Sequence, residues 1–243
     1  MVLKNLPTPA IFAHRGASLQ APENTIAAFE LAYQQGADAI ELDVMLSADE
    51  VPVVIHDPSV DRTTNGKGLV CDLPLATLQE LDAGEGQRIS TLDEIFEIFG
   101  GQLPFNIELK NYTTRDDQIV DKVVEVVKKH DLAESIIFSS FLPKNLNRIA
   151  QLLPQSSRGL LAQDNFVGWI IRTFVFRIGG YEALNPAMNN ISKKKVERIH
   201  RIGRQVYPWI LNDADDIRRA VDWGVDGIIT DDPELAVKAL HKT

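Results

Sequence analysis

The sequence predicts an α/β protein built as a (β/α)8 barrel, with parallel strands inside and helices outside. Short apolar runs alternate with amphipathic segments along the chain, which is the pattern of a parallel sheet. Eight such units fit into 243 residues, a length typical of a barrel that forms one domain. No G-x-G-x-x-G motif follows the first apolar run, which disfavours an open dinucleotide-binding sheet. We therefore expect a single barrel domain over residues 1–243.

The first half of the chain alternates strands with helices and contains one irregular stretch. Pro22 and Glu23 suit the first turn of a helix, and Gly36 suits its end. Residues 57–88, rich in Asp, Thr, Gly and Asn, are expected to form a small insertion after strand two. The expected strands are 10–14, 38–44, 105–110 and 135–139, and the expected helices are 22–35, 91–99 and 116–130.

The second half continues the alternation with shorter runs. A cap, a proline and an acid follow one another at Asp232, Pro233 and Glu234, which indicates the start of the last helix. Asn212 or Asp213 is expected to cap the helix before it. The expected strands are 158–162, 181–184, 205–210 and 226–230, and the expected helices are 143–153, 167–178, 192 onward, 213 onward and 233 onward.

Composition limits the classes of function. The net charge of −9 and the lack of a basic stripe argue against a nucleic-acid partner. Cys71 is the single cysteine, so no internal disulfide can form. No run approaches the ~20 apolar residues of a membrane span. The N-terminal residues contain no apolar stretch of signal-peptide length, so we expect a cytoplasmic protein.

Two acids lie two residues apart in the second predicted strand. Glu41 and Asp43 therefore point to the same face. Residues 47–50 indicate a turn and 51–55 a second extended run that ends at His56. The connection is too short for a helical crossover, so a hairpin should bring His56 back beside the acids. One strand-end acid or one histidine is commonly structural, and the rest of the chain must decide.

Polar residues recur where the predicted strands end, which is the active face of such a barrel. His14, Glu108, Lys110, Trp209 and Asp231 all occupy such positions. Together with Glu41 and Asp43, Glu108 offers oxygen ligands. Such ligands favour Mg²⁺, Ca²⁺ or Mn²⁺ over Zn²⁺. The alternative is that one acid forms a structural ion pair with Lys110.

Cations and histidines near the same edge indicate phosphate chemistry. Arg15 and Lys110 suit an anionic group, provided that Gly16 lets the chain leave strand geometry. His14 and His56 can exchange protons near neutral pH. Phosphoester cleavage needs one proton removed, one supplied and charge stabilisation. The remaining histidines, at 130, 200 and 241, are interpreted as surface residues.

Several motifs between residue 11 and about 234 resemble the glycerophosphodiester phosphodiesterase family. Each is weak alone, but their order and spacing together are specific. They are His14-Arg15-Gly16, Pro22-Glu23-Asn24-Thr25, Glu41-Leu42-Asp43, His56-Asp57, Asp61-Arg62-Thr63-Thr64-Asn65-Gly66, Leu81-Asp82-Ala83-Gly84, Asn106-Ile107-Glu108-Leu109-Lys110, Trp209 with Asn212, and Gly227 through Asp231-Asp232-Pro233.

The resemblance implies a TIM barrel that hydrolyses a glycerophosphodiester to glycerol 3-phosphate and an alcohol. It implies an ion that is usually Mg²⁺ or Ca²⁺. Direct attack by water and attack by the glycerol 2-hydroxyl through a cyclic phosphate stay open. Carried over by position, the site residues are His14 as base, His56 as acid, Glu41, Asp43 and Glu108 as metal ligands, Arg15 and Lys110 on the phosphate, and Trp209 on the glycerol.

Three stretches depart from the family pattern or stand apart from it. The hairpin turn has Asp49-Glu50 where Asp-Gly is usual, and the sixth strand ends Asn185-Pro186 where His-Pro is common. Residues 168–180 are unusually apolar. They indicate a helix packed on the barrel or, alternatively, an apolar flap that meets lipid-like substrates or a membrane surface.

Other functions use a similar frame. A lysophospholipase D or sphingomyelinase-D-like lipid phosphodiesterase would need a comparable two-histidine site. A binding barrel without catalysis would not need every chemical group found here. A metal-dependent aldolase or isomerase fits the fold alone but would not require both histidines together with Arg15.

Overall fold

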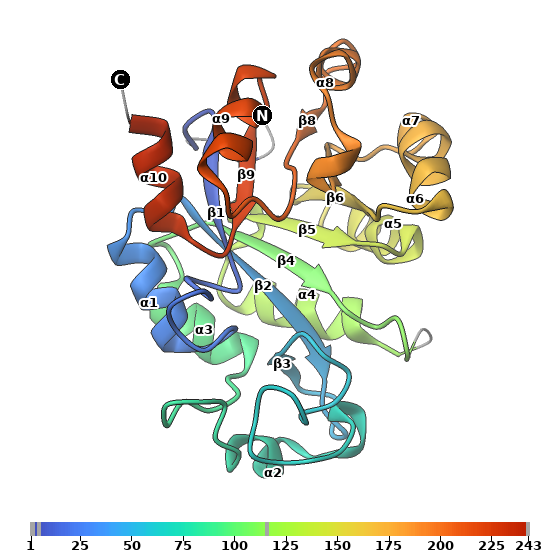
Figure 1. The fold of residues 1–243 in the computed structure, drawn as a ribbon. Helices are drawn as coiled ribbons and strands as arrows, with labels where there is room; N and C mark the ends of the chain where they lie inside the picture. Colours follow the sequence, from blue (N-terminus) through green and yellow to red (C-terminus); the bar gives the residue numbers. More distant parts are fainter. Residues whose placement is uncertain (1–2, 4–5, 115–116, 242–243) are drawn as a thin grey trace.

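A computed structural model describes residue 3 and residues 6–114 and 117–241, and shows a nearly closed parallel barrel surrounded by helices (Figure 1). Neighbouring strands pair in the order β8-β7-β6-β5-β4-β2-β1-β9. Backbone hydrogen bonds from Asp226 to Val206 and from Ile229 to Pro208 bring the two ends together. The barrel strands are β1 (Ala10–His14), β2 (Ala39–Leu46), β4 (Phe105–Leu109), β5 (Ile136–Ser140), β6 (Ser157–Ala162), β7 (Ala183–Pro186), β8 (Gln205–Val206) and β9 (Gly227–Thr230).

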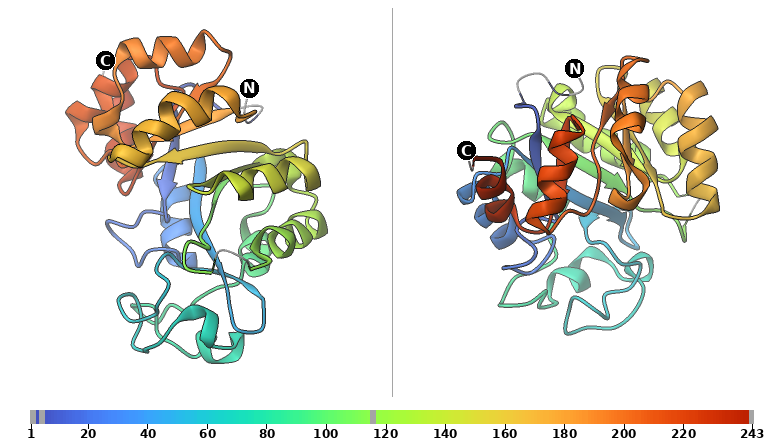
Figure 2. Two further views of the ribbon diagram at one scale, coloured as in Figure 1. Left: turned by 90° about the vertical axis from the view of Figure 1, so that its right-hand side faces the viewer. Right: turned by 45° about the horizontal axis from the view of Figure 1, so that its top comes forward.

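Helices cover the outside of the strands in both views of Figure 2. Their apolar stripes face the barrel, as the period of 3.6 residues predicts. The helices are α1 (Ile26–Gln34), α2 (Leu75–Gln79), α3 (Leu92–Phe99), α4 (Ile119–Lys129), α5 (Pro143–Leu152), α6 (Phe166–Ile170), α7 (Phe176–Ile178), α8 (Lys193–His200), α9 (Ala214–Asp222) and α10 (Pro233–His241). Short 3-10 turns are η1 (Val70–Asp72), η2 (Ala133–Ser135) and η4 (Met188–Asn190), and η3 (Ile171–Val175) is a π-turn. No helix in the described ranges is long and apolar enough to cross a bilayer.

The barrel strands are buried on both faces. Residues such as Leu42 and Ile107 pack outward against the helices. Phe12, Ile137 and Ile229 form a smaller cluster that alternates with them and fills the barrel interior. All eight residues of β2 are buried, including its two acids. Because buried acids are rare unless they are paired or bound, the interior above the apolar cluster is where a site is expected.

The predicted hairpin is present and the predicted insertion follows it. β3 (Pro52–Val54) runs antiparallel to the end of β2. Glu50 takes the left-handed backbone, at φ +61°, so it supplies the turn that glycine usually supplies. Residues 57–88 lie beside β3 at the bottom of Figure 1, and Val60, Val70 and Leu78 form a separate apolar cluster there with Val53.

Some predicted boundaries were wrong. The first helix begins at Ile26 rather than at 22, because Asn24 has φ +59° and cannot sit in a helix. Strand seven is only Gln205–Val206 rather than 205–210, since Pro208 has no N–H to donate. Strand six lies at 183–186 rather than 181–184. The predicted helix start at Asp116 lies outside the described residues.

The apolar stretch after β6 is a helical run made of α6, η3 and α7. Ile171, Val175 and Phe176 pack against the core, so the interpretation of a helix packed on the barrel agrees with the structure. The other side of the run is apolar and exposed, with Phe166, Trp169, Phe174 and Ile178 about half or more accessible to solvent.

Candidate active site

Three acids from neighbouring strands meet at the mouth of the barrel. Strand pairing places His14 opposite Glu41 and Asp43 opposite Glu108. One carboxylate oxygen from each of Glu41, Asp43 and Glu108 lies within 4.8 Å of the others. All three side chains are buried. Like charges at this distance repel strongly in a low-dielectric setting, so the cluster needs compensating positive charge.

Part of that compensation comes from two cations and an amide. Asp43 pairs with Arg15 Nε at 3.2 Å and lies 3.6 Å from Lys110 Nζ. Asn24 Nδ2 donates a hydrogen bond of 2.9 Å to Asp43 Oδ2. Burial opposes ionisation of Asp43, but Lys110 and Arg15 outweigh it and lower the pKa. Asp43 therefore stays a carboxylate.

Glu41 has the opposite balance. Burial raises the pKa of this carboxyl, and the neighbouring charges of Asp43 and Glu108 raise it further. The backbone N–H of Arg15 donates to Glu41 Oε2 at 3.0 Å, but this does not restore the ordinary pKa. Without an added cation, the ionised form of Glu41 is therefore disfavoured.

Glu108 is held by two donors on the side chains that follow it. Lys110 Nζ lies 3.1 Å from Glu108 Oε1, and the Tyr112 hydroxyl donates to the same oxygen at 2.7 Å. The ion pair that the sequence offered as an alternative to a metal site is thus present. Lys110 Nζ also lies 3.6 Å from Asp43 Oδ1, but that buried oxygen accepts no hydrogen bond in the described part of the chain, so one lysine does not satisfy the whole cluster.

Arg15 reaches the site because its backbone leaves the strand. Its φ is +57° and that of Gly16 is +84°. A Cβ at Gly16 would lie 2.6 Å from the backbone of Ala28, so this position requires glycine. The Arg15 guanidinium pairs with Glu23 at 2.9 Å as well as with Asp43. The predicted departure from strand geometry is confirmed.

His14 is oriented by an aspartate at the end of β9. Its Nδ1 lies 2.6 Å from Asp231 Oδ1. Asp231 also accepts hydrogen bonds from Ser18 and Asn212. Burial lowers the pKa of His14, but the hydrogen bond to Asp231 and the charge of Glu41 outweigh it, and the pKa is raised. Because Nδ1 is engaged, Nε2 is the nitrogen left for the pocket.

His56 is oriented in the same manner by its neighbour. Its Nδ1 lies 2.6 Å from Asp57 Oδ1. Arg62 of the insertion donates to Asp57 and, through its other two nitrogens, to Glu23 at 2.8 Å. Since Glu23 also pairs with Arg15, one chain of ion pairs joins the insertion to the barrel mouth.

A cavity of about 290 Å³ opens between these groups. Both histidines contribute to its lining, together with Arg15, two of the three acids and Lys110. The apolar part of the lining consists of Phe141, Leu161, Trp209, Ile210 and Ile229. The structure thus brings together the residues that the sequence singled out, with Asp43 just behind the lining.

Trp209 lies beyond strand β8 rather than within it. Its Nε1 donates to the Asn185 carbonyl oxygen at 2.7 Å, and its ring meets Phe141 edge to face at 6.2 Å. Phe141 in turn contacts Tyr112 at 5.6 Å. These three rings, Tyr112, Phe141 and Trp209, form an aromatic wall. Asn185, which stands where the family commonly has histidine, is buried near this wall. Its side-chain amide nitrogen and oxygen have no hydrogen-bond partner among the described residues.

Sequence reasoning missed the groups that hold the site residues in place. Asn24, Glu23, Asp57 and Asp231 all lie in the quoted motifs, but no contact was assigned to them. The sequence showed only that these residues lie close to a site residue within a motif. It does not show where a loop side chain points. Tyr112 had no signal at all.

The arrangement defines a class. Acids that suit a hard cation, next to basic side chains that suit an anion and histidines that can carry protons, are typical of barrel hydrolases that act on phosphate esters.

Comparison with known proteins narrows that class. Residues 14–235 match the sequence profile of the glycerophosphoryl diester phosphodiesterase family. A glycerophosphodiester phosphodiesterase of Caldanaerobacter subterraneus subsp. tengcongensis is 41% identical, over 96% of this chain and 98% of the relative. One from Bacillus altitudinis is 35% identical, over 94% of this chain and 96% of the relative. The chain therefore belongs to the glycerophosphoryl diester phosphodiesterase family and is a phosphoric diester hydrolase.

Solved structures agree in fold. A phosphodiesterase of Oleispira antarctica, determined in complex with the product sn-glycerol-3-phosphate, has a TM-score of 0.88 and 33% identity, covering 97% of this chain and 98% of its own. A glycerophosphodiester phosphodiesterase of Thermotoga maritima has a TM-score of 0.79 and 31% identity, covering 96% of this chain and 98% of its own. The (β/α)8 prediction is confirmed.

Proposed function

We propose that this enzyme hydrolyses glycerophosphodiesters to glycerol 3-phosphate and an alcohol, with His14 and His56 as the proton-transfer pair. One observation carries the proposal. The two histidines line the same cavity as the acidic cluster, and each has its Nδ1 bound to an aspartate. Such a pair presents two Nε2 atoms to one substrate. The glycerol 3-phosphate found with the Oleispira antarctica relative supports the product.

The three acids fit a hard divalent cation. Their oxygens are close together, one buried oxygen of Asp43 has no hydrogen-bond partner among the described residues, and the environment disfavours the charge of Glu41. We assign Glu41, Asp43 and Glu108 as ligands and expect Mg²⁺ or Ca²⁺, with Mn²⁺ as a further candidate. When bound, the ion would polarise a phosphoryl oxygen and neutralise charge that develops there.

Arg15 and Lys110 would bind the phosphate from the sides of this cluster. Both line the cavity, and both already pair with acids. A guanidinium can bind a phosphate through two parallel hydrogen bonds, whereas an ammonium acts as a point charge. The two therefore complement each other on one tetrahedral group.

The proton steps follow from the two Nε2 atoms. His14 takes the proton of the attacking oxygen, which forms the new bond to phosphorus. His56 gives a proton to the oxygen of the leaving alcohol as its bond to phosphorus breaks. The attacking oxygen belongs either to water, which gives glycerol 3-phosphate directly, or to the glycerol 2-hydroxyl, which gives a cyclic phosphate. In the second case water then opens the cyclic phosphate with the two histidines in exchanged roles: His56 takes the proton of the water, and His14 returns its proton to the 2-oxygen as that bond to phosphorus breaks. The glycerol would pack on Trp209, whose indole is fixed by Asn185.

The test is glycerol 3-phosphate release from glycerophosphocholine and glycerophosphoethanolamine. We expect release by the wild-type enzyme with Mg²⁺ or Ca²⁺, loss with EDTA, and loss in His14→Ala. Lys67→Glu, an exposed change in the insertion, serves as the control and should be fully active.

Three outcomes would count against the proposal. Release that survives EDTA would mean that the acids are not an essential metal site. Turnover of lysophosphatidylcholine without turnover of glycerophosphocholine would favour a lipid phosphodiesterase. Folded enzyme that releases nothing with any of these ions would favour a barrel that only binds.

A further inference from the structure

A second cavity, as large as the active site, lies on the outside of the barrel. Its volume is about 310 Å³. It lies between the helical run α6–α7 and helix α8, which run beside each other in Figures 1 and 2. No residue is shared between its lining and that of the active-site cavity. We call it the outer groove, and the catalytic proposal makes no use of it.

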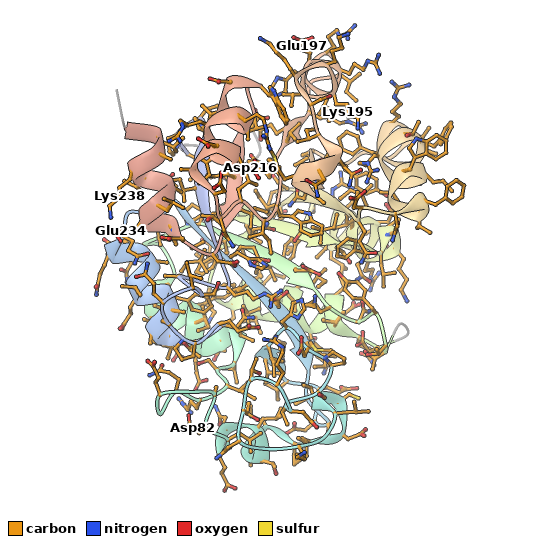
Figure 3. The ribbon with its side chains drawn as sticks, viewed as in Figure 1. Asp82, Lys195, Glu197, Asp216, Glu234 and Lys238 are labelled. Carbon is orange, nitrogen blue, oxygen red and sulfur yellow. The ribbon has the colours of Figure 1, made fainter. Side chains whose placement is uncertain are left out.

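Four cations line the outer groove on a protein with a net charge of −9. They are Arg172, Arg177, Lys195 and Arg198. Within the described ranges, none of the four forms an ion pair with an acid at 4 Å or less. Figure 3 shows Lys195 on the side of α8 nearer to α6 and α7, and Glu197 at the far side of the same helix. The groove is thus locally basic.

Electrostatics and hydrogen bonding both make the groove a suitable place for an anion. Burial lowers the pKa of Lys195 and the charge of Arg172 lowers it further, and these effects outweigh the charge of Asp164, which raises it. Asn190 also lines the groove, is 9% exposed, and has an Nδ2 with no hydrogen-bond partner in the described part of the chain. Buried donors are normally satisfied. An oxyanion in the groove would satisfy the amide and relieve the repulsion between the cations.

An exposed aromatic cluster borders the same groove. Phe166 stacks on Trp169, and Trp169 meets Phe174 edge to face, both with ring centroids 5.8 Å apart. The exposed fractions of these side chains are 73% for Phe166, 48% for Trp169 and 56% for Phe174. Phe176, on the inner side of the run, is buried in the core. The inner side of the helical run is therefore anchored in the core while its outer side exposes the three rings to solvent.

We propose that the outer groove and the aromatic cluster together form a docking site for an anionic phospholipid bilayer, with one lipid phosphate held in the groove. Aromatic and aliphatic side chains next to cations are the composition of surfaces that bind the interface of anionic membranes. The cations match the lipid charge, and the rings match the region between head groups and acyl chains. A free soluble anion would use the groove but would leave the rings without a role.

Docking through this surface would also bring the mouth of the active site close to the bilayer. Gln163 lines the active-site cavity and lies three residues before Phe166, and Arg172 donates to the Gln163 carbonyl oxygen at 2.6 Å. The same short segment after β6 thus carries both one rim of the active-site mouth and the start of the docking surface. A bound enzyme would hold that rim near the bilayer, where diesters released from lipids first appear.

The test is co-sedimentation with vesicles of pure phosphatidylcholine or of phosphatidylcholine mixed with phosphatidylglycerol. We expect the wild-type enzyme to bind the mixed vesicles at least about tenfold better than the neutral ones, and added salt to weaken this binding. Lys195→Glu/Arg198→Glu should remove the preference. Phe166→Ser/Phe174→Ser should weaken binding to the mixed vesicles by about tenfold.

Matched controls separate docking from folding and from general charge. Lys67→Glu and Tyr33→Ser change an exposed cation and an exposed ring elsewhere, and should bind like the wild type. All variants should keep their activity on soluble glycerophosphocholine, which shows that they are folded. The proposal fails if the wild type does not prefer anionic vesicles, or if Lys67→Glu loses as much binding as the groove variant. It also fails if inorganic phosphate binds in the groove while vesicles of both kinds are ignored.

Discussion

The two sides of the barrel mouth differ in chemistry. Strands β1, β2 and β4 carry the histidine, the three acids and the lysine that follows them, and their register places these groups side by side. The facing side contributes Phe141 just after β5, Leu161 near the end of β6 and Trp209 beyond β8. One side can bind and stabilise charge, whereas the other offers shape and apolar surface. Substitutions on the charged side should therefore lower kcat, and substitutions on the aromatic wall should raise KM.

The largest effect is expected from Glu41→Gln. It keeps the shape but removes a ligand charge, and we expect kcat/KM to fall by about 10³–10⁴-fold, because a bound metal supplies several kcal/mol of charge stabilisation. The stability in EDTA should be unchanged or higher, since the buried charge of Glu41 is disfavoured there. Steady-state kinetics and thermal unfolding measure the two. A variant with near-normal activity would remove Glu41 from the metal site.

His56→Ala should lower kcat by about 10²–10³-fold, and it can order the two histidines. A substrate with a more acidic leaving alcohol needs less protonation of that oxygen. We expect such a substrate to restore much of the rate to His56→Ala and little to His14→Ala. The reverse pattern in the same assay would exchange the assignments of acid and base.

Trp209→Ala should act on binding. We expect KM for glycerophosphocholine to rise by about tenfold, with kcat changed by less than about threefold, because the ring contributes contact area and no charge. Phe141→Ala should act in the same direction and more weakly, as Phe141 supports Trp209 edge to face. A fall in kcat equal to that of a histidine variant would contradict the division between the two sides.

The smallest effect is on stability. Burial opposes ionisation of Asp231, yet the bonds from His14, Asn212 and Ser18 lower its pKa to about 2. That contribution to the free energy of unfolding, about 1 kcal/mol once solvent screening of this partly exposed carboxylate is allowed for, is present above pH ~4 and is lost as the pH falls through about 2. The pKa of His14 is raised in the folded state. The contribution of protonated His14 to the free energy of unfolding is therefore present below pH ~6.5 and is lost as the pH rises through the folded pKa. The difference in unfolding free energy between wild type and Asp231→Asn should therefore be greatest between about pH 4 and 6.5.

Urea unfolding at a series of pH values measures this difference. Asn212→Ala is a useful control, since it removes the hydrogen bonds of Asn212 with the carboxylate and the backbone N–H of Asp231 but leaves the contact between Asp231 and His14. A difference that does not change with pH would show that the pair of His14 and Asp231 adds nothing to stability.

The barrel was predictable because the signal is repeated along the chain. Each apolar run and each amphipathic stretch supports the same architecture, so an error at one boundary does not change the fold. Proline accounts for one of the boundaries that were wrong, since strand β8 stops before Pro208, which has no N–H to donate. Whether the chain behaves as one domain stays a prediction.

The site was predictable for residues on strands and less so for residues on loops. Period-two alternation placed Glu41 and Asp43 on one face, and pairing of parallel strands placed Glu108 beside them. The partners Glu23, Asn24 and Arg62 lie on loops whose path depends on left-handed residues and on docking of the insertion. Nothing in local sequence fixes such a path, so the ion-pair chain had to be observed.

The hairpin at the end of β2 places the two histidines in different structural units of the protein. His14 belongs to a barrel strand, but His56 follows the ribbon formed by β2 and β3, and Arg62 ties its aspartate back to the mouth. A descendant could remodel or lose β3 and the insertion that follows it without losing a barrel strand. It would still capture a phosphate, but would be left with a single proton carrier, so a receptor could evolve from this enzyme through changes confined to one excursion of the chain.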